Sequence, residues 1–571
     1  MLTVIVYLLL ITPFVTSSIH QAEVVQTQSG LIQGIIQSSS LNGVSVQKFL
    51  NIPYAEAPIG ELRFEKPRPR TPWNGTLNST EQIIACIQPN QLGLTITEDC
   101  LVLNVWTPFP RPKNASVMVW IHGGAFRFGN SGETQGPNMV AVGNVILVAI
   151  NYRLTALGFL STGDDRIKGN FGLYDQRLAI KWVKDNIASF GGNPNSITLF
   201  GESAGGVSVS AHTLSKESWK YFDKAILQSG SMLMPWAITT DAQIKDGLKW
   251  FLEKAKCNND DKILTCLRNV SESKWKKILD SDGFYEIWTG PVIDKEFISD
   301  HPQKLWAKGE VKNQSIIIGI TKDEWFYMEQ KLLKQSKNIS KYLEYFETKL
   351  EEHFKNSSKA VYDKARELYQ PKCIPSHLEA LKPSVAFGSD SLFICDSRRE
   401  AKMRATLMKS KDVYVFQYSH TPLVQYIPNW YPYGVYGFSA HGLDIVSVFG
   451  APINNTKFRP DDQTLSMRMI LYWTNFAKTG DPNTSTRKLP FVVDNVDSLP
   501  AWPRYNEGKE EYLDMESFSQ MTVRAKLREM HCDFLMDPKG FLEPQITNDS
   551  RKYSLAVPAL FIIIQLTLFF A

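Results

Sequence analysis

The stretch at residues 196–206 constrains the fold more than any other part of this chain. An apolar run at 197–200 leads directly into the run Gly-Glu-Ser-Ala-Gly at 201–205, and a segment with helical character follows. Glycines on either side of a serine allow a sharp turn between a strand and a helix, which exposes the serine hydroxyl at the edge of a sheet. The sequence therefore predicts Ser203 as a nucleophile that directly follows a buried strand.

Further apolar runs of strand length recur along the chain and predict the fold class. They lie at residues 117–121, 145–150, 225–228, 316–320 and 413–417. Continuous apolar runs suit strands that are buried on both faces, and a helical pattern at 173–190 lies between two of them. Strands that alternate with helices predict an α/β fold with one large, mostly parallel sheet covered by helices.

The remaining segments predict how this sheet is extended and covered. Residues 24–46 alternate in polarity and contain Asn42-Gly43, which indicates a β-hairpin. Helix-rich insertions at about 240–310 and 335–410 are expected to lie over the carboxyl ends of the strands. No repeat or low-complexity linker divides the chain, so we expect one domain at residues 19–547.

Charge and composition exclude some classes of partner. The 571-residue chain has a formal net charge of only +4 from 62 basic and 58 acidic side chains, and no basic run with interleaved aromatic residues. We therefore expect no nucleic-acid partner. The cysteines form no pair with zinc-site spacing, and we expect neither a metal nor a cofactor.

Both ends of the chain carry targeting signals. Residues 1–18 are apolar and end in small residues, which predicts a secretory signal peptide. Residues 548–571 combine small residues, a short spacer and an apolar tail, which predicts a glycosylphosphatidylinositol (GPI) attachment signal with Asn548 or Ser550 as the attachment residue. A transmembrane anchor is the alternative. The expected location is extracellular, with the protein held at the cell membrane by the lipid anchor.

Cysteines and glycosylation sequons fit an exported protein. The seven cysteines are expected to form disulfides, and the close pairs Cys86/Cys100 and Cys257/Cys266 would close short loops. Because seven is odd, one thiol is left unpaired or forms an intermolecular bond. Nine sequons upstream of residue 548 are candidate glycosylation sites: Asn74, Asn78, Asn114, Asn269, Asn313, Asn338, Asn356, Asn454 and Asn483.

A serine nucleophile needs a base and an acid, which follow the serine in this fold in the order acid, then histidine. Asp323 and Glu324 come directly after the strand predicted at 316–320 and are both candidates for the acid. His441 lies in a flexible Gly-rich segment after the last strand signals and is favoured as the base. The remaining candidates, any of which can be a surface histidine, are His353, His377, His420 and His531.

An oxyanion hole needs backbone N–H groups that point at the developing negative charge. The run His-Gly-Gly-Ala-Phe at 122–126 directly follows a predicted strand, like the corresponding loop of lipases. An ordinary Gly-Gly turn is the alternative. Two glycine-rich loops that follow two buried strands in this order favour the oxyanion interpretation.

Together these motifs resemble the type-B carboxylesterase/cholinesterase family over nearly the whole mature length. The resemblance rests on short matching stretches along the chain, at residues 51–55, 62–64, 98–104, 151–153, 169–177, 190–194, 201–205, 228–230, 291–294, 322–324, 441–442, 449–450 and 473–480. It implies an α/β-hydrolase fold, with the active site in a gorge formed by helical insertions. The expected activity is hydrolysis of a small-molecule ester through an acyl-enzyme, and a homodimer is possible.

The resemblance also implies roles for single residues. Ser203, Glu324 and His441 correspond to the catalytic triad, and Glu202 corresponds to the carboxylate beside the nucleophile. The oxyanion donors would be the backbone N–H groups of Gly124, Ala125 and Ala204. The implied disulfides are Cys86–Cys100, Cys257–Cys266 and Cys395–Cys532, which leaves Cys373 unpaired.

Two departures from the family bear on substrate and geometry. The segment between Cys86 and Cys100 is short and contains no aromatic residue, whereas cholinesterases have a longer loop with a tryptophan that binds the quaternary ammonium. We therefore expect a general carboxylesterase, with an acetylcholinesterase or other cholinesterase as the alternative. Trp325 stands where the family usually has a glycine directly after the triad acid. This departure bears on the position of the acid side chain relative to the histidine.

Two further functions are compatible with a chain of this family. One is a neuroligin-like surface binding protein, which keeps the fold and lacks the triad. The second is a protein that sequesters esters and turns them over slowly. The complete set of Ser203, Glu324 and His441 argues against the first and leaves the second open.

Overall fold

The computed structural model describes most of the chain. It describes residues 21–41, 43–79, 83–89, 93–133, 136–258, 262–370, 373–408, 410–422, 435–484, 499–517 and 519–542. The predicted signal peptide at 1–18 and the predicted GPI signal at 548–571, with Asn548 and Ser550, lie outside the described residues and stay predictions. Among the described residues, no helix combines the length and apolar character needed to cross a bilayer.

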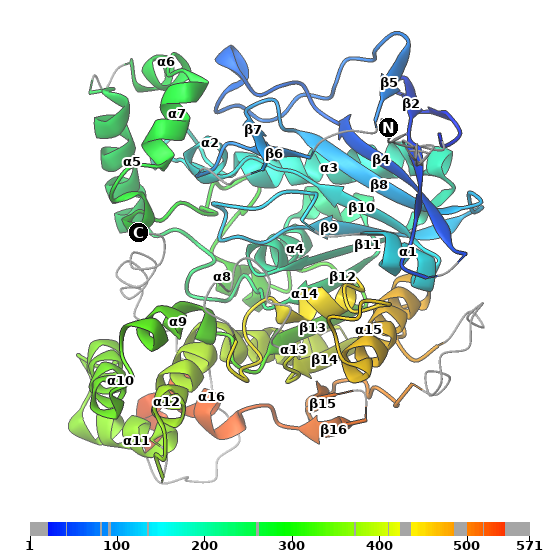
Figure 1. Ribbon diagram of the computed structural model, residues 1–571. Coiled ribbons are helices and arrows are strands. Elements are labelled where there is room, and N and C mark those ends of the chain that lie inside the picture. Colours follow the sequence, from blue (N-terminus) through cyan, green and yellow to red (C-terminus); the bar gives the residue numbers. More distant parts are fainter. Residues whose placement is uncertain are drawn as a thin grey trace, which may run out of the picture.

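One large sheet organises the molecule (Figure 1). Its eleven strands have the order β16-β15-β14-β13-β12-β11-β9-β10-β8-β4-β3, and the pairs from β10 through β15 are all parallel. This confirms the predicted α/β fold with a mostly parallel sheet. The strands are β3 (Ile35–Ser38), β4 (Ser45–Pro53), β8 (Val102–Phe109), β9 (Ala115–Ile121), β10 (Ile146–Ile150), β11 (Gly192–Glu202), β12 (Lys224–Gln228), β13 (Ile316–Thr321), β14 (Val413–Tyr418), β15 (Glu511–Met515) and β16 (Met521–Ala525).

The central strands are apolar throughout because both faces of the sheet are buried. Side chains alternate between the faces of a strand. In β9, Val117 and Val119 belong to one hydrophobic core with residues of α3 (Phe171–Asn186) and α4 (Ala204–Leu214). Met118 and Trp120 belong to a second core with residues of α1 (Gly136–Gly143) and α15 (Pro460–Thr479). The helices therefore form a layer on each face of the sheet.

The predicted hairpin is present, and smaller sheets flank it. β3 pairs antiparallel with β4, with Gln37 opposite Val46. Two small sheets stand apart from the large one: β1 (Val25–Gln26), β2 (Leu31–Gln33) and β5 (Thr76–Asn78) form the first, and β6 (Ile84–Cys86) and β7 (Thr95–Thr97) form the second.

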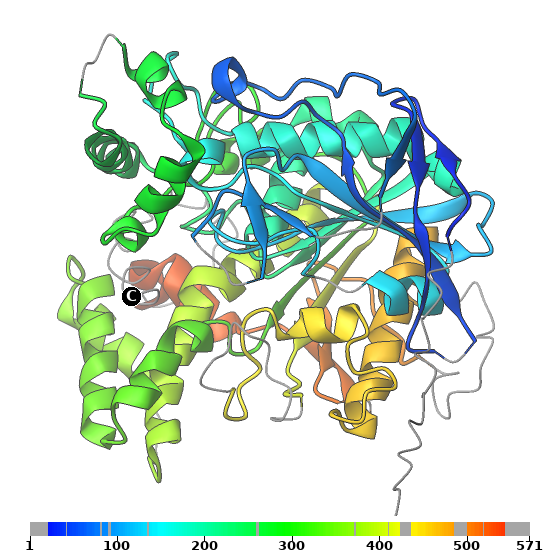
Figure 2. The same ribbon diagram turned by 45° about the horizontal axis from the view of Figure 1, so that its top comes forward.

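The two predicted insertions are helical, and most of their helices lie at the same end of the sheet as two separate groups (Figures 1 and 2). The first contains α5 (Asp241–Ala255), α6 (Ile263–Arg268), α7 (Glu272–Leu279), the 3₁₀ turn η5 (Phe284–Glu286) and α8 (Pro302–Ala307). The second contains α9 (Phe326–Gln335), α10 (Ile339–His353), α11 (Lys359–Tyr369), α12 (His377–Ser389), the π-helical turn η6 (Asp390–Ile394) and α13 (Cys395–Leu407).

Shorter helices complete the fold. They are α2 (Thr155–Phe159), α14 (Leu443–Val448), α16 (Glu529–Met536), α17 (Pro538–Leu542) and the 3₁₀ turns η1 (Gly60–Leu62), η2 (Ile187–Phe190) and η3 (Lys216–Tyr221). The helix predicted at 173–190 corresponds to α3 followed directly by η2.

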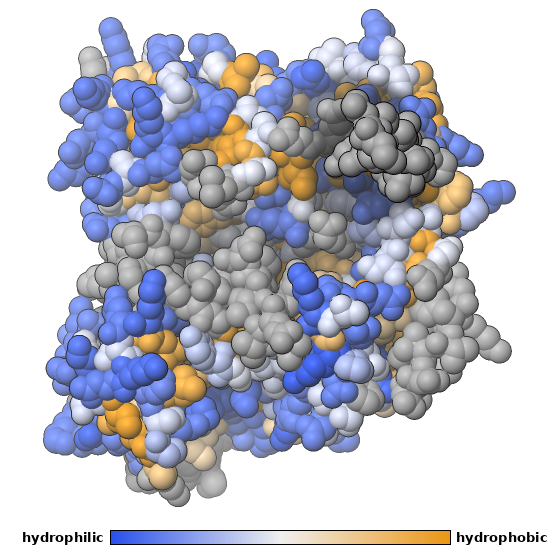
Figure 3. All heavy atoms as spheres, in the orientation of Figure 1, coloured by the Kyte–Doolittle hydropathy of each residue, from blue (hydrophilic) through white to orange (hydrophobic). Residues whose placement is uncertain are grey.

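Three disulfides link parts of the described chain. Cys86 pairs with Cys100, Cys257 with Cys266 and Cys395 with Cys532, as the resemblance implied. Cys373 is a free, exposed cysteine. All nine candidate glycosylation asparagines within the described residues are exposed. The face seen in Figure 3 is mostly hydrophilic, with apolar residues in small patches.

Candidate active site

Ser203 lies in the sharp turn between β11 and α4, as predicted. Its backbone has φ 57° and ψ −125°, a conformation that non-glycine residues rarely adopt and that occurs mainly where the surrounding structure enforces it. The Ser203 N–H donates to the carbonyl of Gln228 at 2.9 Å, which ties the turn to the end of β12. A Cβ atom on Gly205 would lie 2.0 Å from the carbonyl oxygen of Ile121, so only glycine allows this close approach of turn and β9.

Glu324 lies beyond the end of β13 and contacts His441. The Glu324 side chain is fully buried, and its Oε2 lies 2.5 Å from Nδ1 of His441. Its Oε1 accepts hydrogen bonds from the hydroxyl of Ser229 at 2.6 Å and from the N–H of Thr321 at 2.7 Å. These bonds fix the orientation of the carboxylate toward the imidazole.

Asp323, the other candidate for the acid, has a different role. Its Oδ2 accepts a hydrogen bond from the N–H of Ser439 at 2.9 Å, and its own N–H donates to the carbonyl of Ser439 at 3.0 Å. Asp323 also forms a parallel β-bridge with Ala440. Asp323 thus joins the segment that carries Glu324 to the segment that carries His441.

The remaining candidate histidines make contacts elsewhere. Of the histidines in the described part of the chain, His441 is the one that contacts Glu324. His420 contacts Asp462, and three further candidates pack against aromatic rings: His353, His377 and His531.

Glu202 approaches the other nitrogen of the same imidazole. Its Oε1 lies 3.1 Å from Nε2 of His441, at ion-pair distance but without hydrogen-bond geometry. Burial raises the pKa of Glu202. Burial opposes the charged form of His441, but the charges of Glu202 and Glu324 outweigh it, so the pKa of His441 is raised. A base flanked by two carboxylates holds a proton readily.

The sequence patterns missed a further carboxylate near this imidazole. Asp444 is fully buried, and its Oδ2 accepts a hydrogen bond from the amide of Gln228 at 2.7 Å. The same amide group accepts a hydrogen bond from the indole of Trp473 at 3.1 Å. Burial raises the pKa of Asp444 to about 6. The position of Asp444 three residues after His441, at the start of a helix, is the signal that would have pointed to it.

The segment after β9 forms a tight loop against Ser203. Gly124, Ala125 and Phe126 all have positive φ values, of 95°, 54° and 59°. A Cβ atom on Gly123 would lie 3.1 Å from Cβ of Ser203, so the loop packs directly against the nucleophile turn. Within the described part of the chain, the N–H groups of Gly124 and Ala125 donate to no backbone carbonyl. These donors can therefore serve a substrate oxygen.

Trp325 is accommodated without displacing Glu324. Its indole N–H donates to Oε1 of Glu329 at 2.8 Å, and its backbone N–H donates to the hydroxyl of Ser389 at 2.9 Å. The ring packs against Gly388, where a side chain would overlap it. A glycine in α12, Gly388, thus makes room for the tryptophan that replaces the usual glycine after the acid.

The segment between Cys86 and Cys100 approaches the loop after β9 through one polar side chain. The amide nitrogen of Gln88 donates to the carbonyl of Gly129 at 3.0 Å, and the N–H of Gly129 donates back to Gln88 at 3.0 Å. Gln88 is fully buried. These reciprocal bonds hold a carboxamide, rather than an aromatic ring, against the segment that follows β9.

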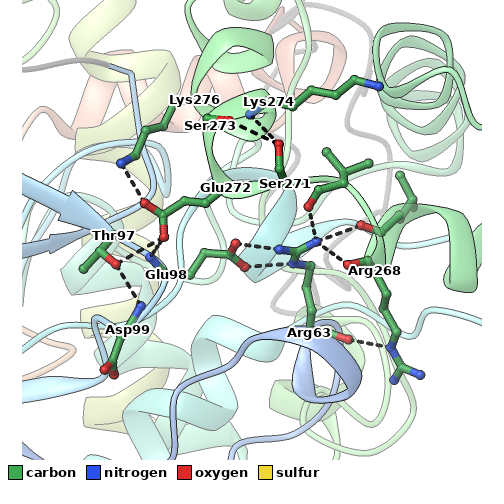
Figure 4. Close-up of polar contacts among 12 residues, drawn as sticks. Arg63, Thr97, Glu98, Asp99, Arg268, Ser271, Glu272, Ser273, Lys274 and Lys276 are labelled. Atoms are coloured by element: carbon green, nitrogen blue, oxygen red, sulfur yellow. Dashed lines mark hydrogen bonds and ion pairs between the residues drawn. The ribbon is translucent and has the colours of Figure 1, made fainter.

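The far end of the same segment is fixed by ionic contacts (Figure 4). The buried side chains of Glu98 and Arg63 form an ion pair at 2.6 Å, and Arg63 also donates to the carbonyls of Leu267 in α6 and of Val270 just after it. Glu272 at the start of α7 accepts from the backbone N–H of Glu98 at 3.1 Å. The segment is therefore fastened to the first helical insertion.

A cavity of about 320 Å³ is lined in part by Lys322 and Asp323, the residues just before the proposed acid. Asp323, Asp390, Glu516 and Arg528 are among the charged residues that line it, and Ser203 and His441 do not. This cavity is distinct from the place where the predicted site residues meet.

Comparison with known proteins identifies the family. The model of the carboxylesterase family matches residues 21–535. The chain belongs to the carboxylesterase family. It is 34% identical over 556 residues to a cholinesterase of Mus musculus, a match that covers 92% of this chain and 88% of that protein. It is 34% identical over 544 residues to an acetylcholinesterase of Bungarus fasciatus, with coverage of 89% and 85%.

Membership has direct consequences for this carboxylesterase-family protein. The predicted α/β-hydrolase fold is confirmed, and the protein is a carboxylic ester hydrolase of the serine type. Disulfides are typical of proteins that fold outside the cytosol. The three disulfides and the cholinesterase relatives favour a secreted or extracellular protein.

Proposed function

We propose that the enzyme hydrolyses esters through Ser203, His441 and Glu324. His441 takes the proton of the Ser203 hydroxyl, and the serine oxygen attacks the ester carbonyl. Protonated His441 then gives the proton to the leaving alcohol, and water releases the acyl group by the same route. The 2.5 Å contact between Nδ1 of His441 and Glu324 supports this assignment, since a carboxylate on Nδ1 leaves Nε2 as the nitrogen that can accept the serine proton.

The oxyanion of the tetrahedral intermediate is assigned to the N–H groups of Gly124, Ala125 and Ala204. The strained loop at Gly124 and Ala125 supports this, because it packs against Ser203 with both N–H groups unused by backbone carbonyls. Ala204 is the first residue of α4, where N–H groups have no partner inside the helix. Preorganised donors of this kind stabilise developing charge strongly in a water-poor site.

A fluorophosphonate probe tests the nucleophile. The wild-type enzyme should be labelled at one residue, and Ser203→Ala should abolish labelling. Ser210, a buried serine in α4, the helix that follows Ser203, provides the matched control. Ser210→Ala should be labelled like the wild type. Labelling that survives Ser203→Ala would refute the assignment.

We further propose that neutral esters are preferred over choline esters. The observation that carries this preference is Gln88, whose amide is bonded to Gly129 in a segment without any aromatic residue. A desolvated cation–π contact contributes about 2 kcal/mol, or roughly thirtyfold in binding, and a quaternary ammonium loses that partner here. We therefore favour a general carboxylesterase over a cholinesterase.

Choline esterase activity is the second candidate, and specific residues favour it. Glu202 supplies a carboxylate beside Ser203. Burial, with further contributions from the charges of Tyr285 and Glu202, raises the pKa of Tyr327 to about 12, so these three side chains are electrostatic neighbours. Two tyrosine rings near a carboxylate offer a cation an alternative site. The two relatives compared above are named for choline-ester hydrolysis.

One kinetic comparison separates these two candidates. Acetylthiocholine and its uncharged dimethylbutyl isostere differ in the charge and not in the shape of the leaving group. We expect kcat/KM for the charged ester to be at least about tenfold lower. An equal or higher value for acetylthiocholine would place choline esterase first.

A further inference from the structure

Arg127 is a buried cation directly after Phe126, in the loop that packs against Ser203, and within the described part of the chain it has no counter-ion. Its side chain is 1% exposed. Among the residues that the structure describes, no carboxylate pairs with its guanidinium, and its Nε has no hydrogen-bond partner. Burial lowers the pKa of Arg127 to about 10, so the group is still charged at neutral pH. Burying an unpaired charge costs desolvation free energy, so other contacts of the guanidinium must stabilise it.

The side-chain hydrogen bonds and ring contacts of Arg127 lead to one segment of the first helical insertion. Its Nη1 donates to the carbonyl of Tyr285 at 3.3 Å, and its Nη2 donates to the carbonyl of Ile287. The guanidinium carbon lies 5.3 Å from the ring centroids of both Phe284 and Trp288. Two ring faces and two carbonyl oxygens therefore replace the counter-ion.

The backbone of Arg127 closes the glycine-rich loop. The N–H groups of Arg127 and Phe128 both donate to the carbonyl of Gly124, at 2.8 and 2.9 Å. The ring of Phe128 stacks on that of Tyr285, with centroids 6.1 Å apart. Loop and insertion are thus joined by the backbone turn, by the guanidinium and by an aromatic stack.

The segment that Arg127 holds also reaches the imidazole of His441. Trp288 contacts Trp236 at 6.4 Å between ring centroids, and Trp236 contacts Phe393 at 5.6 Å. Phe393 in turn contacts the ring of His441 at 4.9 Å. A continuous row of rings therefore runs from the guanidinium to the base.

We propose that Arg127 is a positioning residue for ester hydrolysis. It holds the loop that contains Gly124 and Ala125 against the aromatic rings of Phe284 and Trp288. This inference rests on the proposed oxyanion role of that loop. Positive φ values at Ala125 and Phe126, two successive non-glycine residues, persist only when surrounding contacts enforce them, and Arg127 supplies such contacts. Without these contacts, the N–H donors shift relative to the oxyanion, while the substrate still enters the site.

The test compares Arg127→Met, Arg127→Lys and Arg177→Met. Methionine keeps the bulk without charge or donors, and lysine keeps the charge without the planar fork. Arg177 is a matched control: its guanidinium carbon lies 4.1 Å from the ring centroid of Phe297, and it donates to serine hydroxyls away from the loop. Active sites are counted by stoichiometric reaction with a fluorophosphonate, and kcat and KM for p-nitrophenyl acetate are expressed per active site.

For Arg127→Met we expect kcat per active site to fall at least about thirtyfold with KM within about threefold, because misplaced donors affect the transition state and not the ground state. Arg127→Lys should recover part of kcat, and Arg177→Met should keep kcat within about twofold. Should Arg127→Met not fold, Trp288→Leu removes one ring from the guanidinium and should lower kcat in the same way.

A merely structural Arg127 would reduce the number of active sites or the thermal stability, with kcat per active site unchanged. That result, or a change in KM alone, overturns the proposal and leaves the proposed function intact. A wild-type enzyme that fails to react with the fluorophosphonate would instead overturn the proposed nucleophile and this inference together.

Discussion

Gly388 and Trp325 lie in direct contact, such that a Cβ atom on Gly388 would be 2.2 Å from Cγ of Trp325. The residue after the proposed acid and the glycine of α12 are therefore matched to each other. A large side chain next to Glu324 is possible because α12 has no side chain at this point.

Gly388→Ala should lower both stability and activity. Alanine normally favours a helix over glycine, but here the added methyl group overlaps a ring, and overpacking of this kind costs about 1–3 kcal/mol. Displacement of Trp325 should also move Glu324 and lower kcat. Urea unfolding and esterase kinetics measure the two effects. Gly508→Ala, where the nearest atom lies 3.6 Å away, is the control and should change neither.

Glu324→Gln and Asp323→Asn should differ sharply in activity. The first removes the charge that holds Nδ1 of His441, and comparable changes in serine hydrolases lower kcat by about 10³–10⁴-fold. The second keeps an oxygen that can accept from the N–H of Ser439, and kcat should stay within about threefold. Equal losses in the two variants, measured on p-nitrophenyl acetate, would contradict the assignment of Glu324.

Glu202→Gln should move the acidic limb of the pH–rate profile downward. Glu202 and Glu324 favour the charged imidazolium of His441, which cannot accept a proton, so they raise the pKa above which the base is available. Removal of one carboxylate lowers this pKa, and the midpoint of kcat/KM should fall by at least about one pH unit. Asp444→Asn should give a smaller shift in the same direction. A midpoint that stays or rises in Glu202→Gln would be inconsistent with this electrostatic picture.

Glu98→Gln should destabilise the fold far more than Glu61→Gln. Glu98 is the buried partner of Arg63, and removing one member of such a pair costs about 3–5 kcal/mol because the other charge is left buried. Glu61 pairs with Arg268 but is 90% exposed, so its loss should cost less than about 1 kcal/mol. The free energy of unfolding in urea measures both, and similar values would show that the ion pair in Figure 4 contributes little.

The parts of the fold that sequence could predict are those that depend on local pattern. β9 and β10 were readable because every residue between 117–121 and 146–150 is buried, which leaves no polar position to confuse the pattern. β16 was not predicted because it is an edge strand with mostly exposed side chains. Its place is set by pairing with β15 and not by its own hydrophobicity.

The candidate site divides in the same way. Ser203 is defined by glycines next to it, and its turn is local. The choice between Asp323 and Glu324 could not be made from spacing, because both follow β13 and only tertiary contacts direct one of them to His441. Ser229 and Asp444 come from separate elements, and no local pattern indicates that they reach this site.

The Cys395–Cys532 disulfide spans 137 residues of the chain, and these contain His441 but neither Ser203 nor Glu324. A protease that cuts once between the two cysteines would therefore produce two polypeptides that remain covalently joined. Such a nicked molecule would migrate as one species on a non-reducing gel and as two after reduction. The base would stay attached to the half of the molecule that carries the nucleophile, whatever the position of the cut.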